Sequence, residues 1–193
     1  MRFWSKRPTA SGQELADRFE TLGLFEHLDP DEAQRAKAAF ARDGLDALYR
    51  TELRRSAFGG DAEDLAEGGI GEFLEALRPH LAERGVELPQ VDDDFREDGY
   101  DVRIGDEVHS IYGADAVEGD MARGWGISWV RAFEIVNGLL ERAGARERAY
   151  TVPEWEVWFL TPEQFDAIRA EIDEPRDRPY TPVDEPPWYG ADH

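Results

Sequence analysis

The hydrophobic periodicity changes between residues 70 and 112, and this change limits the fold classes open to the chain. Apolar residues first recur at the spacing of a helix, at Ile70, Phe73, Leu74, Leu77 and Leu81. Tyr100, Val102 and Ile104 then alternate with charged residues, as in a strand with one buried face, and a second apolar run follows at 108–112. We predict a β-hairpin over residues 99–112, and a helix beside a hairpin indicates an α+β fold.

Two registers are open to this hairpin. Gly105 and Asp106 suit a two-residue turn, because glycine accepts the positive φ that such a turn requires. The apolar pattern instead favours a three-residue loop, which places Val108 and Tyr112 on the same face as Ile104. We favour the three-residue loop, since it keeps the apolar side chains together.

Capping signals and apolar stripes predict further helices. Ser11 and Asp29 are predicted caps for two N-terminal helices, and Thr161 begins a capping box before another. The longest apolar stripe predicts a core helix over residues 127–144. Between these last two helices, residues 154–160 (EWEVWFL) are rich in apolar residues and predict a buried strand with apolar side chains on both faces.

The strand prediction assigns its side chains to opposite faces. One face carries Trp155, Val157 and Phe159, and the other carries Trp158 and Leu160. We therefore predict one mostly helical α+β domain over residues 1–172. Its small antiparallel sheet is built from the hairpin at about 99–112 and the strand at about 155–160.

The C-terminal segment differs in composition from the rest. Residues 173–193 hold five of the eleven prolines, and we predict an acidic, proline-rich tail. Such a tail is either extended and mobile or laid against the domain by Trp188 and Tyr189.

Composition limits the compartment and the chemistry. A chain of 193 residues with 41% hydrophobic and 11% aromatic residues can bury a core. It contains no cysteine, which excludes disulfides and thiolate metal sites. We find neither the apolar run of a signal peptide nor a stretch of the roughly 18 apolar residues that would span a membrane. We therefore expect a cytoplasmic protein without membrane contact, and we predict no cofactor.

The strongest chemical signal is negative charge. The formal net charge is −21, from 43 acidic and 22 basic residues, and such a field repels phosphate backbones. We therefore expect no direct nucleic-acid binding and an attraction to basic proteins. Residues 91–120 concentrate the charge, with eleven acids against two arginines.

This acidic segment also contains aromatic residues, so it has the composition of a surface that docks a basic partner. The predicted partner-binding residues are Asp93, Asp94, Asp98, Tyr100, Asp101 and Tyr112. The alternative interpretation is a solvated loop whose aromatic side chains belong to the core.

Catalytic and metal-binding patterns are weak in this sequence. A calcium loop of the EF-hand type that starts at Asp94 would place Arg96 at its third position and Gly105 at its twelfth, where acids are needed. The histidines have no spacing typical of a zinc site, and they are His27, His80, His109 and His193. We predict no catalytic and no metal-ligating residue.

In size, acidity and lack of a catalytic motif, the chain resembles the immunity proteins that neutralise contact-delivered bacterial toxins. The resemblance is one of general character, so it assigns no role to any single residue. It implies a bacterial cytoplasmic inhibitor whose carboxylates pair with the basic residues of a partner such as a nuclease-like toxin, while an aromatic side chain fills its cleft.

Two alternative functions remain open. A DNA-mimicking inhibitor would present its carboxylates where a duplex presents phosphates. A divalent-metal-dependent hydrolase would instead use clustered carboxylates, with the ion held by Asp92, Asp93, Asp94 and Asp98.

Overall fold

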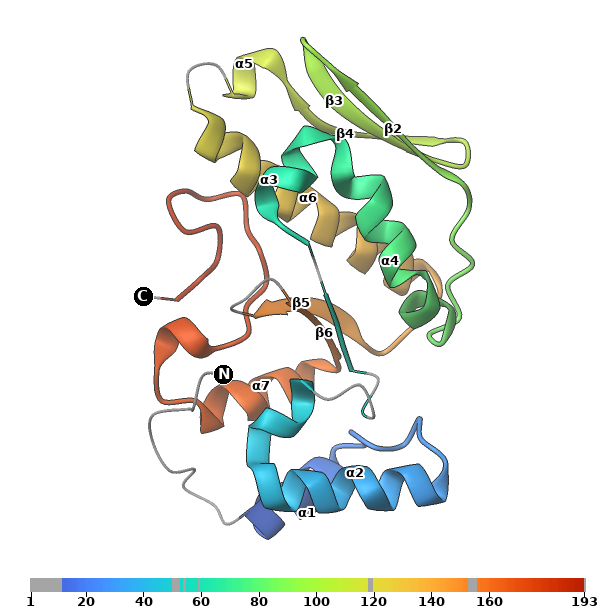
Figure 1. The fold of residues 1–193 in the computed structure, drawn as a ribbon, viewed down its shortest axis with the longest axis vertical. Coiled ribbons are helices and arrows are strands. Elements are labelled where there is room, and N and C mark those ends of the chain that lie inside the picture. The colour runs from blue at the N-terminus through green and yellow to red at the C-terminus, as the bar shows by residue number, and fades with distance from the viewer. Residues whose placement is uncertain are drawn as a thin grey trace.

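Two three-stranded antiparallel sheets lie at different levels of the molecule, with helices between and beyond them (Figure 1). The computed structural model describes residues 12–49, 53, 55–58, 60–117, 120–152 and 156–192. The predicted α+β class is confirmed.

The helices and strands follow one another along the whole described chain. The helices are α1 (Gly12–Thr21), α2 (Pro30–Asp43), α3 (Ala62–Asp64), α4 (Ile70–Ala82), α5 (Ala114–Val117), α6 (Met121–Arg142) and α7 (Pro162–Glu171). Shorter helical turns are η1 (Gly44–Tyr49), η3 (Leu65–Gly69) and η4 (Pro175–Asp177). The strands are β1 (Ser56–Phe58), β2 (Val91–Arg96), β3 (Gly99–Ile104), β4 (Glu107–Gly113), β5 (Arg148–Val152) and β6 (Glu156–Leu160).

Local capping interactions start two of the predicted helices. The side chain of Asp29 accepts a hydrogen bond from the backbone N–H of Glu32 at 2.8 Å, and the Glu32 side chain bonds back to the cap. Thr161 begins α7 with the same reciprocal arrangement. The predicted cap at Ser11 lies outside the described residues.

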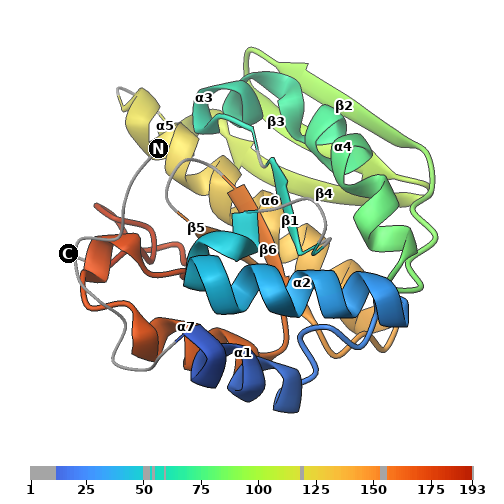
Figure 2. The same ribbon diagram turned by 60° about the horizontal axis from the view of Figure 1, so that its bottom comes forward.

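The sheet β1-β6-β5 separates two hydrophobic cores, with β6 as its central strand. Val157 and Phe159 pack in the core that contains α4 and α6. Trp158 and Leu160 pack on the other side, with α1, α2 and α7 (Figure 2). All four side chains are fully buried, which confirms the two-faced strand. Trp155 lies outside the described residues.

The second sheet, β2-β3-β4, covers the opposite side of α4 and α6. Tyr100, Val102 and Ile104 of β3 contribute to the same core as these helices. The predicted hairpin and the predicted strand therefore belong to two sheets and not to one, because a layer of helices lies between them (Figure 1). The strand β2 was not predicted.

The hairpin between β3 and β4 forms around the shorter turn. Ile104 pairs with Glu107, which leaves only Gly105 and Asp106 between the strands. Gly105 has a φ of +59°, as this turn requires. The favoured three-residue loop is therefore wrong, and Val108 faces away from the core with 54% of its surface exposed.

A β-bulge explains why the apolar pattern was misleading. Tyr100 pairs with Tyr112, but Asp101 pairs with Ser110, so Ile111 is an extra residue without a partner in β3. The bulge returns Tyr112 to the side of Tyr100. One expected side chain of β4 thus reaches the predicted face although the turn differs.

The outer edge of β5 is covered by other parts of the chain. Asn137 of α6 accepts a hydrogen bond from the Ala149 backbone N–H at 2.7 Å and donates to the Ala149 carbonyl at 3.0 Å. Tyr180 of the C-terminal segment pairs with Thr151 through backbone bonds of 2.9 and 3.0 Å. The backbone N–H and C=O groups of Ala149 and Thr151, which point away from β6, are therefore all hydrogen-bonded.

The C-terminal segment lies against the domain. Beyond the Tyr180 bridge, Arg169 of α7 bonds Asp192 at 2.6 Å. The ring of Tyr189 packs so closely on Gly126 of α6 that a Cβ there would overlap it. Of the two arrangements predicted for the tail, the structure has the docked one, in which an aromatic ring rests on a glycine.

The tail contact can be tested with two glycines of the same helix. We expect Gly138→Ala to raise the free energy of unfolding by about 0.5–1 kcal/mol, because alanine favours helix and only the Arg142 side chain, at 3.5 Å, is near the new Cβ. Gly126→Ala should lose this gain, since the methyl group displaces Tyr189. Urea denaturation and limited proteolysis of the tail measure both effects. Equal stabilisation by both variants would contradict the docked tail.

Candidate protein-interaction surface

The first six residues of the acidic segment form the edge strand β2, whose side chains alternate between two environments. Asp93 pairs with Val102, which is fully buried, so Asp93 faces the helices. Asp92 and Asp94 face the opposite, solvent-exposed side of the sheet. The three consecutive aspartates are therefore not equivalent.

Asp93 provides the cap that α4 lacks locally. Its carboxylate accepts hydrogen bonds from the Gly71 backbone N–H at 3.0 and 3.1 Å and from the Tyr100 hydroxyl. The Tyr100 oxygen in turn accepts from the Ile70 N–H at 3.1 Å. Gly69, at the cap position, has no side chain to do this. Asp93 of β2 and Tyr100 of β3, which lie 22 and 30 residues further along the chain than their partners, therefore satisfy the N–H groups of Gly71 and Ile70 at the start of the helix.

Burial dominates the acid–base behaviour of this network. It raises the pKa of Asp93, although the hydrogen bonds from Tyr100 and Gly71 lower it. Burial and the bond to Asp93 also raise the pKa of Tyr100, so the phenol keeps its proton at pH values at which an exposed tyrosine would lose it. Both folded-state pKa values are raised, so the protonated form of each group favours the folded state. This contribution to the free energy of unfolding is complete at a pH below the unfolded-state pKa, and it is lost as the pH rises through the folded-state pKa.

Two further aromatic side chains surround Tyr100. The Tyr112 hydroxyl donates to the Ala66 carbonyl at 2.5 Å, and its ring meets Tyr100 edge-on at 5.9 Å. Phe95 meets Tyr100 from the other side at 5.7 Å, yet 51% of its surface is exposed. Phe95 therefore lies at the border between the core and solvent.

The exposed side of the sheet carries an ion-pair cluster around Arg96. Its guanidinium group contacts Asp94, lies 3.4 Å from Asp98 and bonds Asp101 at 2.7 Å. The hydrogen bond from Arg96 lowers the pKa of Asp101. Three carboxylates share one cation, so the cluster keeps an excess of negative charge.

An acidic groove adjoins β2 on the side of the helices. It has a volume of 500 Å³ and contains Asp64, Glu67 and Glu72 above apolar residues of η3 and α4. It reaches β2 at Gly68, which lies so near Phe95 that an added Cβ would be 3.2 Å from the Cβ of Phe95. No basic residue is among its described lining residues.

We call the groove, the exposed side of β2 and the turn that follows β2 together the acidic edge, because the groove and the strand meet where Gly68 lies next to Phe95. Its acidic residues are all exposed, and they are Asp64, Glu67, Glu72, Asp92, Asp94, Glu97 and Asp98. Phe95 is its exposed apolar residue.

The six residues predicted to bind a partner fall into two groups. Asp94, Asp98 and Asp101 surround Arg96 on the exposed side. The others are engaged on the side of the helices, and they are Asp93, Tyr100 and Tyr112. Their role in partner binding stays a prediction. Sequence analysis does not identify the groove residues, because they carry no motif and form a groove only in the folded chain.

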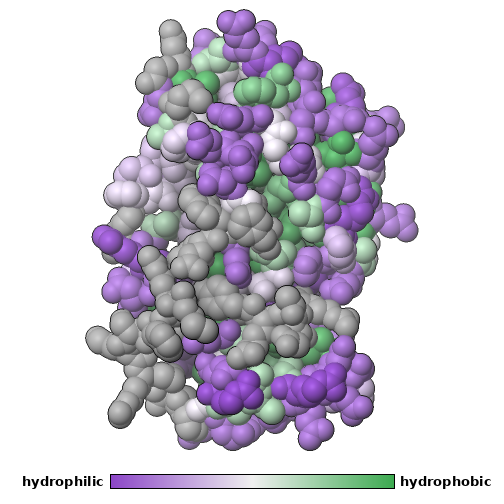
Figure 3. All heavy atoms as spheres, viewed as in Figure 1, coloured by the Kyte–Doolittle hydropathy of each residue, from purple (hydrophilic) through white to green (hydrophobic). Residues whose placement is uncertain are grey.

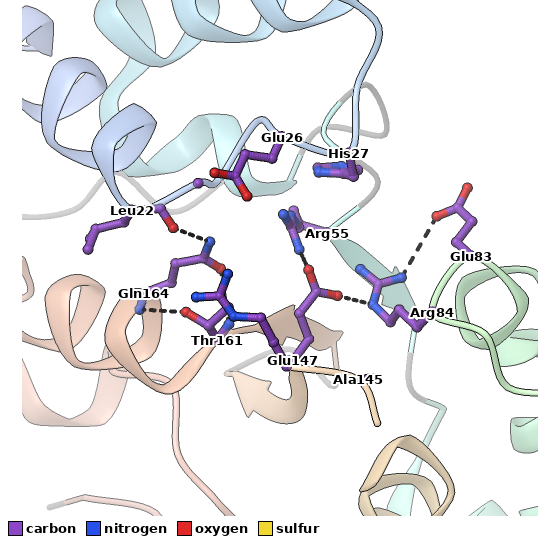
Figure 4. A pocket seen from close by; sticks show the side chains of 12 residues that line it. Leu22, Glu26, His27, Arg55, Glu83, Arg84, Ala145, Glu147, Thr161 and Gln164 are labelled. Carbon is purple, nitrogen blue, oxygen red and sulfur yellow. Dashed lines mark hydrogen bonds and ion pairs between the residues drawn. The ribbon is translucent and has the colours of Figure 1, made fainter. Parts of the chain in front are cut away.

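A second concave region, of 420 Å³, lies where the loop after α1, the start of β1 and the end of α4 meet (Figure 4). Glu147, directly before β5, extends between two arginines. One of its carboxylate oxygens pairs with Arg55 and the other with Arg84. Sequence analysis did not identify this triad, because its members are single charged residues far apart in the chain.

The two arginines of the triad are almost completely buried, with 3% and 6% of their side chains exposed. Burial lowers the pKa of Arg55 to about 9 and that of Arg84 to about 10. Arg55 also donates to the Leu24 carbonyl at 3.0 and 3.2 Å, and Arg84 lies over the Phe159 ring at 4.3 Å.

All these contacts are within the chain, so the triad links chain segments to one another and gives no indication of a bound ligand. Leu24 follows α1, Arg55 precedes β1, Arg84 follows α4 and Glu147 precedes β5. The triad therefore joins four chain segments at one point. Glu147 is essential to it, because without this carboxylate two buried cations would face each other.

No protein-family model matches the chain, and neither a curated protein nor a solved structure matches it. Its function is therefore argued from the surface itself. Among the described residues, none of the helices combines the length and the apolar character needed to cross a bilayer. Within the same ranges, no three His, Asp or Glu side chains are grouped so that they could hold a metal ion.

The capping role of Asp93 predicts a contrast between neighbouring aspartates. Asp93→Ala should lower the free energy of unfolding by about 1–3 kcal/mol, because the Gly71 N–H and the Tyr100 hydroxyl lose their acceptor. Asp92→Ala, on the exposed side, should change it by less than about 0.5 kcal/mol. Chemical denaturation at pH 7 compares the two. Similar losses of stability in the two variants would show that Asp93 does not stabilise the start of α4.

The triad predicts a second contrast. Glu147→Ala should destabilise the protein by about 3–5 kcal/mol, since it removes the carboxylate shared by the buried Arg55 and Arg84 and leaves Glu83, 3.8 Å from Arg84, as the ion-pair partner of that arginine. Arg146→Ala, at the exposed neighbouring residue, should cost less than about 0.5 kcal/mol. Thermal and urea denaturation measure the difference. A Glu147→Ala protein as stable as the Arg146→Ala control would show that the triad contributes nothing.

Proposed function

We propose that the protein binds a basic protein partner through the acidic edge and thereby occludes the basic surface of that partner. The observation that carries the proposal is the exposed Phe95 of an edge strand that itself bears exposed carboxylates and adjoins the acidic groove. In the view of Figure 3, hydrophilic residues cover most of the described surface and leave only small apolar areas. An exposed aromatic ring within a charged surface is a typical anchor of a protein interface.

Charge and apolar contact have different roles in this proposal. Carboxylates in the acidic edge accelerate the encounter with a basic surface and orient it, an effect that salt weakens. Phe95 and the apolar floor of the groove supply area that is buried on docking. A toxin that acts on nucleic acid is one suitable partner, because the lysines and arginines that bind phosphate would pair with these carboxylates.

The position of Phe95 favours a protein partner over DNA mimicry. A mimic of a duplex needs regularly spaced negative charges and no exposed aromatic ring in their midst. The acidic edge instead has acids on both sides of one phenylalanine, which favours contact with a basic side chain next to an apolar one. The metal-dependent hydrolase gains no support from the described residues.

The proposal predicts that charge position matters more than total charge. A variant with Glu72→Gln, Asp94→Asn and Asp98→Asn should associate about ten-fold more slowly with its partner at low salt, because these acids steer the encounter. The partner is first captured from the source lysate by the tagged wild-type protein. Association is then measured by surface plasmon resonance at two salt concentrations, with the captured protein purified.

The matched control removes the same charge elsewhere. The control variant carries three substitutions at exposed positions outside the acidic edge, Glu141→Gln, Asp166→Asn and Glu174→Gln. It should associate at nearly the wild-type rate. Equal slowing by both variants would show a general effect of net charge. No basic protein captured at low salt would contradict the proposal as a whole.

A further inference from the structure

The two sheets protect their edges differently. On β5, Asn137 and Tyr180 satisfy the outward backbone groups of Ala149 and Thr151. On β2, five of the six residues are exposed, and the strand lies at the end of the order β2-β3-β4. The β5 edge is therefore closed by other parts of the chain, whereas the β2 edge is open.

The hydrogen-bond pattern determines which backbone groups of β2 are open. The Gly105 N–H donates to the Gln90 carbonyl at 2.9 Å, so residue 90 faces β3. Bonded pairs recur at every second residue in an antiparallel ladder, so the backbone N–H and C=O groups of Asp92 and Asp94 also point toward β3. The N–H and C=O groups of Val91, Asp93 and Phe95 consequently point away from the sheet. No described residue bonds these outward groups.

The charges around this edge select its occupant. A second copy of the chain would bring its own aspartates against Asp92 and Asp94, which repels self-pairing. A basic segment would instead meet carboxylates on both sides, from Asp92 and Asp94 on the exposed side of the sheet and from Glu67 and Glu72 near the groove.

We propose that β2 accepts an extended basic segment of the partner as a fourth strand of the sheet. The inference rests on the proposed function and specifies how the acidic edge would bind. The added strand bonds the outward backbone groups of Val91, Asp93 and Phe95. Its side chains alternate, so those on one side lie near Asp92 and Asp94, and those on the other lie near Phe95 and the groove.

This geometry favours one pattern of partner sequence. Basic residues at every second position can face Asp92 and Asp94, while the intervening apolar residues can contact Phe95. The Asp93 carboxylate already accepts bonds from Gly71 and Tyr100, so β2 is held in place before the strand arrives. A held strand loses little conformational entropy on binding.

Two synthetic peptides separate strand addition from simple charge attraction. One alternates Lys and Val over about eight residues, long enough to span β2, and the other alternates Lys and Pro with the same charge. The Lys-Pro peptide cannot form the backbone ladder, because proline lacks the N–H group. Titration calorimetry with the intact protein should give at least about ten-fold tighter binding of the Lys-Val peptide.

Amide hydrogen exchange followed by NMR tests the position of the added strand. The Lys-Val peptide should slow the exchange of the Asp93 and Phe95 amides, which point outward in the free protein. The Asp92 and Asp94 amides already bond β3 and should change much less. The same alternation along β2 is not expected from a peptide held only by its charge.

A pair of substitutions at Phe95 tests whether the outward backbone N–H of this residue bonds the added strand. Phe95→Ala removes the ring, whereas Phe95→Pro removes both the ring and the outward N–H, and an edge strand tolerates proline at such a position. The proline variant should bind the Lys-Val peptide several-fold more weakly than the alanine variant, with no difference for the Lys-Pro peptide. Circular dichroism of both variants verifies the fold.

The outcomes separate the two proposals. Equal affinity for both peptides, without protection of the Asp93 and Phe95 amides, would overturn strand addition and leave recognition by charge intact. Binding of neither peptide would also overturn it, whereas the proposed function depends on capture of a basic protein. Self-association of the protein, measured by analytical ultracentrifugation, would show a second copy on this edge and would overturn the basic occupant.

Discussion

The burial of β6 on both faces is the constraint on which the rest of the structure depends. Its residues alternate between two cores, with Val157 and Phe159 on one side and Trp158 and Leu160 on the other. Each such side chain contributes about 1.5–3 kcal/mol when fully buried. Because one strand serves both cores, neither core can be lost without exposing half of β6. The Arg55–Glu147–Arg84 triad reinforces this arrangement where the two cores meet.

Asp93 connects this scaffold to the acidic edge. A shift of β2 by one residue would turn Asp92 and Asp94 toward the helices and Asp93 toward solvent. Only the observed register places a single carboxylate at the start of α4, where the Gly71 backbone N–H and the Tyr100 hydroxyl satisfy it. A run of aspartates is therefore compatible with a strand, because one of the three has hydrogen-bond partners on the side of the helices and the other two lie on the opposite side of the sheet.

Local signals explain the parts of the fold that the sequence predicted. Caps such as Asp29 and Thr161 act within a few residues, and the alternation in β6 is visible without knowledge of its neighbours. The strand β2 could not be predicted in this way, since aspartate is unfavourable in strands and its stabilising contacts come from α4. The division into two sheets, the triad and the groove also depend on residues distant in sequence. The hairpin turn was predictable from Gly105, but a bulge in β4 concealed the signal.

The charge of the acidic edge has a cost in the isolated protein that a basic partner would relieve. Asp94, Asp98 and Asp101 repel one another, and Arg96 offsets only part of this repulsion because it is one cation among three carboxylates. Such repulsion is tolerable at the surface, where water screens it, and it opposes pairing of the open strand with another copy. The same charges become favourable when lysines or arginines replace the water. An open edge that repels itself and attracts the opposite charge is therefore better suited to a basic partner than to self-assembly.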